Sequence, residues 1–384
     1  MVNLESGTAR SLAVSGNLKQ NLEIEMIKNL INLILTVFIS IIVISCNGQV
    51  KSKSEQNQNT EIGTIVSGLD NQIWVIFQDS KGNYWFGSNG NGVYKYDGTK
   101  IIQFTTKDGL AYDQIRGIQE DKEGNLYIET QNGISKYNGT EFTTLQPIKS
   151  SKNEWKLEPN DLWFGYNAND LYRLDGDSLY ELELPRKDLK KAFGIETEGV
   201  PFEGNNNSPY AVFGVNKDKN GNIWFGTATA GAFRYDGDSF LWFGEKELST
   251  LPDGRVPGVR SMIQDKNGYY WLSNIYSKYK INSDLPKGYE KIEAAELPEK
   301  IINDKILYFM SGIADTQGKL WMTTYDDGIW CYNGESLSNI EIHNGTENVL
   351  LISIYLDDRG GIWLGTNNDG VYKHNSGKFE KFEP

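Results

Sequence analysis

The chain has 384 residues and a formal net charge of −13, with 38 Lys and Arg against 51 Asp and Glu, which argues against the basic surface that binds nucleic acid. Its 40 glycines, 10 Trp, 21 Tyr and 16 Phe, with only 10 prolines, exclude a largely disordered or collagen-like chain. They favour short strands joined by tight turns.

The N-terminal segment has the pattern of a signal peptide. Lys28 follows Met26 closely, and an apolar run from Leu33 to Ile44 ends at Ser45. Asn29 and Asn32 leave this stretch shorter than the roughly 20 apolar residues of a membrane-spanning helix. We therefore predict a signal peptide over residues 1–45. Because residues 1–25 carry no pattern of their own, they are interpreted as an over-extended start.

The cysteine after this segment is the predicted lipidation site. Val43-Ile44-Ser45-Cys46 resembles the lipobox of bacterial lipoproteins, in which the cysteine is acylated and becomes the mature N-terminus. An uncleaved anchor is the alternative. If Cys46 carries lipid, Cys331 is the only thiol left, so no intramolecular disulfide can form. Residues 46–60 are polar and without aromatics, and are expected to be a flexible tether.

From residue 61 to residue 384 the sequence is repetitive. Six units place an aspartate six residues before an aromatic residue, with a glycine three residues after the aspartate. A seventh unit, Asp161 to Gly165, keeps the aromatic strand but lacks the aspartate turn. The aligned aromatics are Trp85, Tyr127, Trp163, Trp224, Trp271, Trp321 and Trp363, with steps of 42, 36, 61, 47, 50 and 42 residues. This period is typical of propeller blades.

Each unit contains four short strand patterns. An apolar stretch such as Ile73 to Phe77 precedes the turn, then come an aromatic strand, a third strand such as residues 92–98, and an outer strand such as Lys100 to Thr105. The sequence therefore predicts an all-β fold, a seven-bladed β-propeller of four-stranded antiparallel blades. We interpret the repeated aspartates as turn-capping residues and the repeated tryptophans as packing between blades. Two segments, residues 61–66 and residues 378–382, both fit the outer strand of the last blade, so the sequence does not decide which of them forms it.

The units resemble the two-component regulator propeller repeat of Bacteroidetes-type bacteria. The resemblance rests on stretches such as Ile73 to Gly98 (IWVIFQDSKGNYWFGSNGNGVYKYDG) and Gly221 to Gly237 (GNIWFGTATAGAFRYDG). In that family the propellers are periplasmic sensing regions of membrane histidine kinases. Pro384 directly follows the last unit, so the resemblance implies a stand-alone lipoprotein without a kinase. We expect a monomer on the periplasmic side or at the cell surface, tethered to the membrane by its lipid.

One face of the expected propeller carries long loops and is the candidate binding face. Trp74, Arg116 and Arg260 stand five residues before their turn aspartates, at the entry of the channel strands, where they could receive an anionic or planar ligand. Phe213, Met310 and Ile352 share this register, so packing between blades is the alternative. The loop residues of the candidate site are Asn89, Asn91, Tyr325, Asp326, Asp327, Asn367 and Asn368. Such side chains suit an oligosaccharide, a peptide or a partner such as a sensor protein.

Catalysis has little support in the sequence. Propeller enzymes of the streptogramin-lyase type also carry a G-x-I-W-F pattern, but that resemblance requires a histidine pair with a glutamate and magnesium. The only histidines are His343, which precedes Asn344-Gly345, and His374, which replaces the tyrosine of the third strand. A lactonase would need acidic metal ligands facing the channel, and no channel register repeats Asp or Glu. We expect a non-catalytic module with no metal and no cofactor, and keep the lyase or lactonase type as the alternative.

Overall fold

The computed structural model describes residues 62–149, 154–165, 171–194, 208–251, 254–293, 308–345 and 347–384. They belong to one compact unit, Ile62 to Pro384. The expected signal peptide, the tether and Cys46 lie outside the described residues. None of the helices in the described part is long and apolar enough to cross a membrane.

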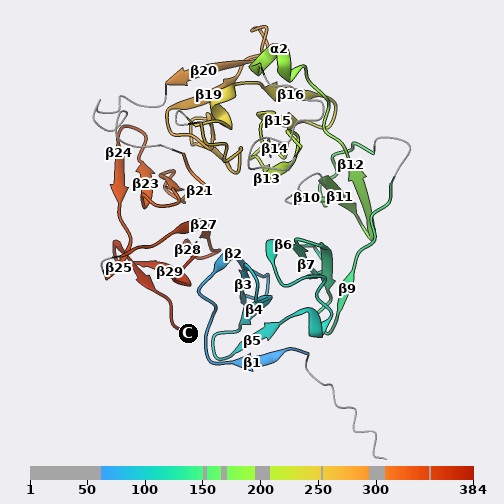
Figure 1. The fold of residues 1–384 in the computed structure, drawn as a ribbon, viewed down its shortest axis with the longest axis vertical. Helices are drawn as coiled ribbons and strands as arrows, with labels where there is room; N and C mark the ends of the chain where they lie inside the picture. Colours follow the sequence, from blue (N-terminus) through green and yellow to red (C-terminus); the bar gives the residue numbers. More distant parts are fainter. Residues whose placement is uncertain are drawn as a thin grey trace, which may run out of the picture. The chain divides into compact units, whose positions relative to one another are not determined.

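Seven antiparallel sheets follow one another along the chain, which confirms the predicted seven-bladed propeller (Figure 1). Blade 1 is β2 (Ile73–Gln78), β3 (Tyr84–Ser88), β4 (Val93–Tyr96) and β5 (Ile101–Phe104); blade 2 is β6 (Ile115–Glu120), β7 (Leu126–Thr130), β8 (Gly133–Tyr137) and β9 (Phe142–Thr144); blade 3 is β10 (Leu162–Phe164), β11 (Leu171–Asp175) and β12 (Ser178–Leu182); blade 4 is β13 (Val212–Lys217), β14 (Ile223–Thr227), β15 (Ala232–Tyr235) and β16 (Phe240–Phe243). Blade 5 is β17 (Met262–Gln264), β18 (Tyr270–Leu272), β19 (Ser277–Ile281) and β20 (Tyr289–Glu293); blade 6 is β21 (Ser311–Ala314), β22 (Leu320–Thr323), β23 (Ile329–Tyr332) and β24 (Leu337–Ile340); blade 7 is β27 (Leu351–Leu356), β28 (Ile362–Thr366), β29 (Val371–Asn375) and β30 (Lys378–Lys381).

The connections between blades carry little further regular structure. Two 3-10 turns, η1 (Thr106–Asp108) and η2 (Lys246–Leu248), follow the outer strands of blades 1 and 4. A short helix, α2 (Leu189–Phe193), follows blade 3, and a two-stranded hairpin, β25 (His343–Asn344) with β26 (Glu347–Asn348), leads into blade 7. The fold is therefore almost wholly β.

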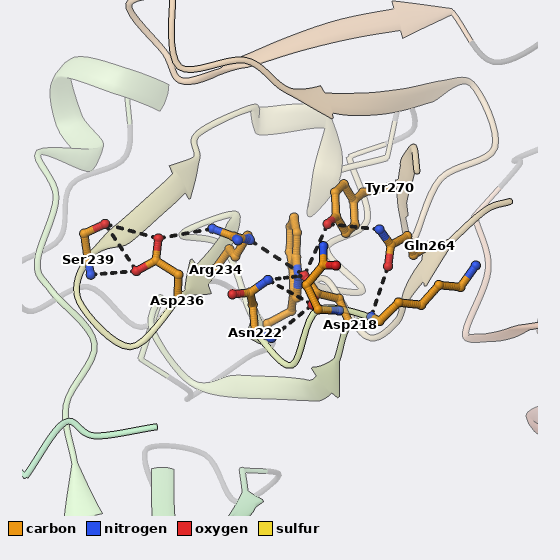
Figure 2. Close-up of polar contacts among 10 residues, drawn as sticks. Asp218, Asn222, Arg234, Asp236, Ser239, Gln264 and Tyr270 are labelled. Atoms are coloured by element: carbon orange, nitrogen blue, oxygen red, sulfur yellow. Dashed lines mark hydrogen bonds and ion pairs between the residues drawn. The ribbon is translucent and has the colours of Figure 1, made fainter. Parts of the chain in front are cut away.

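The turn aspartates cap the first hairpin of their blades, as predicted. In blade 4, one carboxylate oxygen of Asp218 accepts the backbone N–H groups of Asn220 and Asn222, at 2.9 and 3.0 Å. Its other oxygen accepts the indole N–H of Trp224 at 3.1 Å and the hydroxyl of Tyr270, from the next blade, at 3.2 Å (Figure 2). The same aspartate-to-aromatic bond joins Asp79 to Trp85, Asp121 to Tyr127, Asp265 to Trp271, Asp315 to Trp321 and Asp357 to Trp363, at 2.8 to 3.2 Å.

These bonds set the charge state of the aspartates. Burial alone would raise the pKa of Asp218, but hydrogen bonds from Asn222 and Trp224 outweigh it and lower the pKa below its usual value. At Asp357, bonds from Trp363 and Tyr84 outweigh burial in the same way and lower the pKa. The folded state therefore favours the charged forms of Asp218 and Asp357, which link the first hairpins of blades 4 and 7 to the core.

Neighbouring blades pack so closely that the second strand needs a small residue two places after its aromatic. At Gly365 of blade 7, an added Cβ would lie 2.6 Å from the carbonyl oxygen of Ile73 in blade 1. At Gly87 of blade 1, it would lie 2.5 Å from the side chain of Ile115 in blade 2. The first residues of β2 and β6 thus rest on the second strands of blades 7 and 1.

The ring closes without exchange of a strand between the two chain ends. β30 is the outer strand of blade 7, while β1 (Thr64–Val66) pairs with β5 as a fifth strand of blade 1. The two segments that could have competed for one place therefore occupy separate blades. Side chains seal the last junction: the Tyr84 hydroxyl donates to Asp357 at 2.7 Å, and Trp363 and Phe382 pack on Phe86.

Blade 3 departs from the expected four strands. In the described residues its sheet has the strand order β10-β11-β12. Because β10 contains the aligned Trp163, it corresponds to the second strand of the other blades. The inner strand, nearest the channel, is therefore the one not found among the described residues. The chain instead enters this blade from outside, because Ile148 forms a parallel bridge to Tyr180 of β12. Residues 154–160, just before β10, form no strand. Figure 1 shows β10 between the inner strands β6 and β13.

Candidate functional site

A cavity of about 660 Å³ lies at the centre of the ring. Its walls come from the inner strands of blades 1, 2, 4, 6 and 7, from Arg260 just before β17, and from Leu162, Trp163 and Gly165 of blade 3. At blade 3, described residues of the second strand β10 line the cavity. The volume falls in the range of about 300–1,000 Å³ of small-molecule sites.

β-bulges aim a ring of side chains into this cavity. The pairing of the first two strands skips Trp74, Arg116, Phe213 and Ile352, so each is the extra residue of a bulge. In a regular strand, successive side chains face opposite sides, whereas a bulge re-aims one of them. All six residues of the register noted in the sequence therefore line one cavity: Trp74, Arg116, Phe213, Arg260, Met310 and Ile352. Packing between blades, the alternative interpretation, also describes two of them, because Arg116 packs on Trp74 and Arg260 on Phe213 of the preceding blade.

The two arginines of this ring each lie over an aromatic side chain from the preceding described inner strand. The Arg116 guanidinium carbon is 4.6 Å from the ring centre of Trp74, and that of Arg260 is 4.8 Å from the ring centre of Phe213. The guanidinium of Arg116 also donates to the side chains of Asn89, Gln114 and Gln131, and that of Arg260 donates to the carbonyl of Pro257, so both charged groups are held in place beside their aromatic partners. The cavity thus presents two arginine–aromatic pairs.

A chain of hydrogen bonds runs along the rim of blades 6, 7, 1 and 2. The Asn367 amide donates to the Tyr325 hydroxyl at 3.3 Å, and its carbonyl accepts the indole N–H of Trp74 at 2.9 Å. Trp74 stacks on Arg116, which donates to Asn89 at 3.0 Å. The structure therefore brings five of the sequence-predicted site residues into one continuous network, which fixes the orientation of Trp74 and Arg116.

The other four predicted loop residues form hydrogen bonds with residues outside the central cavity. Asn91 donates to Asp70 at 3.1 Å on the exposed side of blade 1. Asp327 accepts the indole N–H of Trp330 at 3.1 Å, and Asn368 caps the backbone N–H of Leu350 at 2.9 Å. The carbonyl of Asp326 accepts a bond from Asn348 at 3.4 Å. None of these four lines the central cavity.

Two polar residues of blade 2 line the cavity and were not singled out from the sequence. The amide of Gln119 donates to the carbonyl of Trp163 at 2.7 Å, across the space beside β10. Glu129 stands where the repeat has Gly87, Gly165, Gly226 and Gly365, and its carboxylate lies against Gly117 of the adjacent strand. A glutamate in place of the repeated glycine was the visible signal, and it marks the side of blade 2 that faces blade 3.

The two histidines lie away from the cavity. His343, on the exposed hairpin, is 3.1 Å from the carboxylate of Glu341. His374 packs between Trp321 and Phe379, where burial lowers the pKa of its imidazole. Neither contributes to the cavity lining. Within the described ranges, no group of three or more His, Cys, Asp and Glu side chains is arranged to hold a metal ion.

Comparisons with known proteins agree with the repeat pattern. Residues 67–90 and 345–368 match the family model described as "two component regulator propeller". No match among curated proteins was found.

Among solved structures, this chain is similar to two extracellular domains from B. thetaiotaomicron. That of a protein described as the hybrid two component system BT4673 has 22% identity and a TM-score of 0.54, over 82% of this chain and 40% of that one. That of BT3049 has 18% identity and a TM-score of 0.54, over 82% of this chain and 41% of the other. Streptogramin B lyase has 14% identity and a TM-score of 0.52, over 81% of this chain and 98% of the lyase. The chain spans about two fifths of the two extracellular domains, and identities this low establish the shared fold alone.

Proposed function

We propose that this chain, which carries repeats of the two-component regulator propeller type, is a non-catalytic binding module of the cell envelope. Its central cavity holds a polar ligand or a segment of a partner protein, and binding serves sensing or signalling. The observation that carries the proposal is the pair of arginine–aromatic stacks that bulges aim into one cavity. The extracellular origin of the similar domains supports the envelope location.

The arrangement suits recognition better than turnover. An acyl- or glycosyl-transfer site needs a nucleophile or acid–base pair within hydrogen-bond reach of each other. The histidines sit outside the cavity, and the rim contacts of Trp74 and Arg116 orient these side chains for binding. A ligand carboxylate would be attracted by the positive charges of Arg116 and Arg260 in the cavity lining, and Trp74 and Phe213 beside them supply apolar surface.

We further propose that acylation of Cys46 tethers the module to a membrane. Metabolic labelling with a palmitate analogue should mark the native chain and spare the Cys46→Ser variant, which should leave the membrane fraction. A variant that stays membrane-associated would contradict lipid anchoring and favour an uncleaved anchor.

The binding function is tested by a thermal-shift screen of the purified protein with oligosaccharides, peptides and small carboxylates, followed by titration calorimetry. A ligand that binds only the folded state raises the melting temperature. We expect a hit whose affinity falls about tenfold or more in Arg116→Gln, because charged hydrogen bonds contribute about 1.5–3 kcal/mol. Asn91→Ala, away from the cavity, is the matched control and should bind normally. Turnover of a lactone, a cyclic depsipeptide or a glycan that a single substitution abolishes would support the lyase or lactonase type instead.

A further inference from the structure

Blade 5 places its arginine in the central cavity without a β-bulge. In blades 1, 2, 4 and 7, the pairing of the first two strands skips the residue that lines the cavity. In blade 5 the pairing is regular and ends where Met262 pairs with Leu272, two residues after Arg260. Arg260 nevertheless lines the same cavity, so another contact must fix its backbone.

The hydroxyl of Ser273 supplies this contact. Its Oγ accepts the backbone N–H of Arg260 at 2.8 Å and that of Ser261 at 3.0 Å. The backbone N–H of Ser273 donates to the carbonyl of Ser261 at 3.1 Å, and its carbonyl accepts the N–H of Phe309, which leads into blade 6, at 3.0 Å. Because Ser273 is fully buried, water does not compete for these bonds. They fix the two residues that precede β17.

Ser273 adopts a backbone conformation that is rare for serine. Its φ is 49°, in the left-handed region, and among the described residues other than glycine only Ser376 shares this region. In blade 4 the equivalent place belongs to Gly226, where an added Cβ would lie 2.1 Å from the carbonyl oxygen of Val259. In blade 5 the hydroxyl of the left-handed serine contacts the inner strand of its own blade instead. A strained residue of this kind persists where the surrounding contacts hold it, and such residues cluster at functional sites.

We propose that Ser273 is a positioning residue that holds Arg260 in place for ligand recognition, an inference that rests on the proposed function. The serine fixes the Arg260 backbone, and the guanidinium lies over Phe213 with its Nε donating to the carbonyl of Pro257 at 3.0 Å. Blade 4 closes the other side, because a Cβ at Gly214 would lie 2.2 Å from the Arg260 carbonyl oxygen. A charge that is ordered before binding costs less entropy when a ligand arrives. The strained serine thus does in blade 5 what the bulges do in blades 1, 2, 4 and 7.

The first test needs no ligand. In protein labelled with ¹⁵N-arginine, each arginine gives one Nε–H signal in the NMR spectrum, and the Arg260 signal is assigned by its loss in Arg260→Gln. Because this N–H lies beside the Phe213 ring and bonds to Pro257, its chemical shift reports the position of the side chain. Ser273→Gly and Ser273→Ala should each shift or broaden the Arg260 signal. The Arg116 signal, from blade 2, should stay unchanged as the internal control.

The strain at Ser273 gives a second readout, the melting temperature. Both variants lack the hydroxyl, but only alanine keeps a Cβ at positive φ, so Ser273→Gly should melt at a higher temperature than Ser273→Ala. Ser376→Gly is the matched control, because Ser376 has the same φ of 49° in an exposed turn of blade 7. It should raise the melting temperature of the native chain and leave the Arg260 signal unchanged.

The binding readout uses sodium acetate as a minimal carboxylate probe, titrated at constant ionic strength. Acetate should shift the Arg116 and Arg260 signals of the native chain. In Ser273→Gly the apparent dissociation constant at Arg260 should rise about threefold or more, with that at Arg116 unchanged.

A cooperative melting transition establishes that each variant folds. An Arg260 signal that stays unchanged in folded Ser273→Gly and Ser273→Ala would overturn the inference. If acetate shifts both signals of the native chain and Ser273→Gly leaves the response of Arg260 unaltered, the inference alone falls and the proposed function stands. If acetate shifts neither signal of the native chain, the carboxylate recognition of the proposed function falls, and the inference falls with it.

Discussion

The substitution Gly365→Ala tests how tightly the ring closes. The added Cβ would lie 2.6 Å from the carbonyl oxygen of Ile73, whereas ordinary contact begins at 3.4 Å, so the inner strand of blade 1 must move by about 0.8 Å. Ile73 is fully buried in the core between blades 7 and 1, which resists such a shift. Overpacking of this kind costs about 1–3 kcal/mol, and we take about 2 kcal/mol as the expected loss.

The assay is the melting temperature by differential scanning calorimetry. For a unit of this size, a loss of about 2 kcal/mol corresponds to a fall in melting temperature of about 3 °C. The matched control is Gly90→Ala in a loop of blade 1, where an added Cβ would meet nothing within 4 Å. It should change stability by less than about 0.5 kcal/mol. Equal losses in the two variants, or an unchanged melting temperature in Gly365→Ala, would refute the close packing derived for blades 7 and 1.

Three further predictions concern charge and reactivity. Because the folded pKa values of Asp218 and Asp357 lie below their usual value, their contribution to stability is complete above about pH 3.9 and is lost as pH falls through the folded pKa. Urea midpoints should therefore drop between pH 5 and pH 3, and a midpoint that rises in this window would contradict it. Arg173 is fully buried between carboxylates, so Arg173→Met should cost about 3–5 kcal/mol in urea unfolding, and a loss below about 1 kcal/mol would contradict a paired buried charge. Burial raises the pKa of Cys331 to about 11, so at pH 8 iodoacetamide should label no thiol of the native acylated protein, while one rapidly labelled thiol would identify an unmodified Cys46.

The repeats made most of the fold predictable from the sequence. The spacing of Asp79 and Trp85, repeated in five further units, predicts the hairpin and its aspartate cap, which the structure shows. This succeeds because the aspartate and the turn amides that it caps are at most four residues apart, so local chemistry determines their contact. The bond from the Trp85 indole to Asp79 was not predicted, because the sequence indicated only that the tryptophans pack between blades. The closure of the ring was harder to predict from the sequence, since the pairing of β1 with β5 depends on contacts between distant segments.

The candidate site was predictable in part. The register of Trp74, Arg116 and Arg260 was visible, but the bulges at Trp74 and Arg116 were not, because the units with and without a bulge all keep five positions between this register and the turn aspartate. The three-stranded sheet that the described residues form in blade 3 had two signals, the 36-residue step before Trp163 and the glutamate at position 129. To interpret these two signals, one must know which strand of the next blade packs against position 129.

The most direct test of binding in the central cavity is deuterium exchange of the purified protein with and without the strongest ligand from the screen. We predict slower exchange in β6 and β13, the inner strands that line the cavity, and unchanged exchange in the outer strands β5 and β16. Protection confined to the outer strands, or to loops away from Arg116 and Trp74, would contradict a ligand site at the centre of the ring.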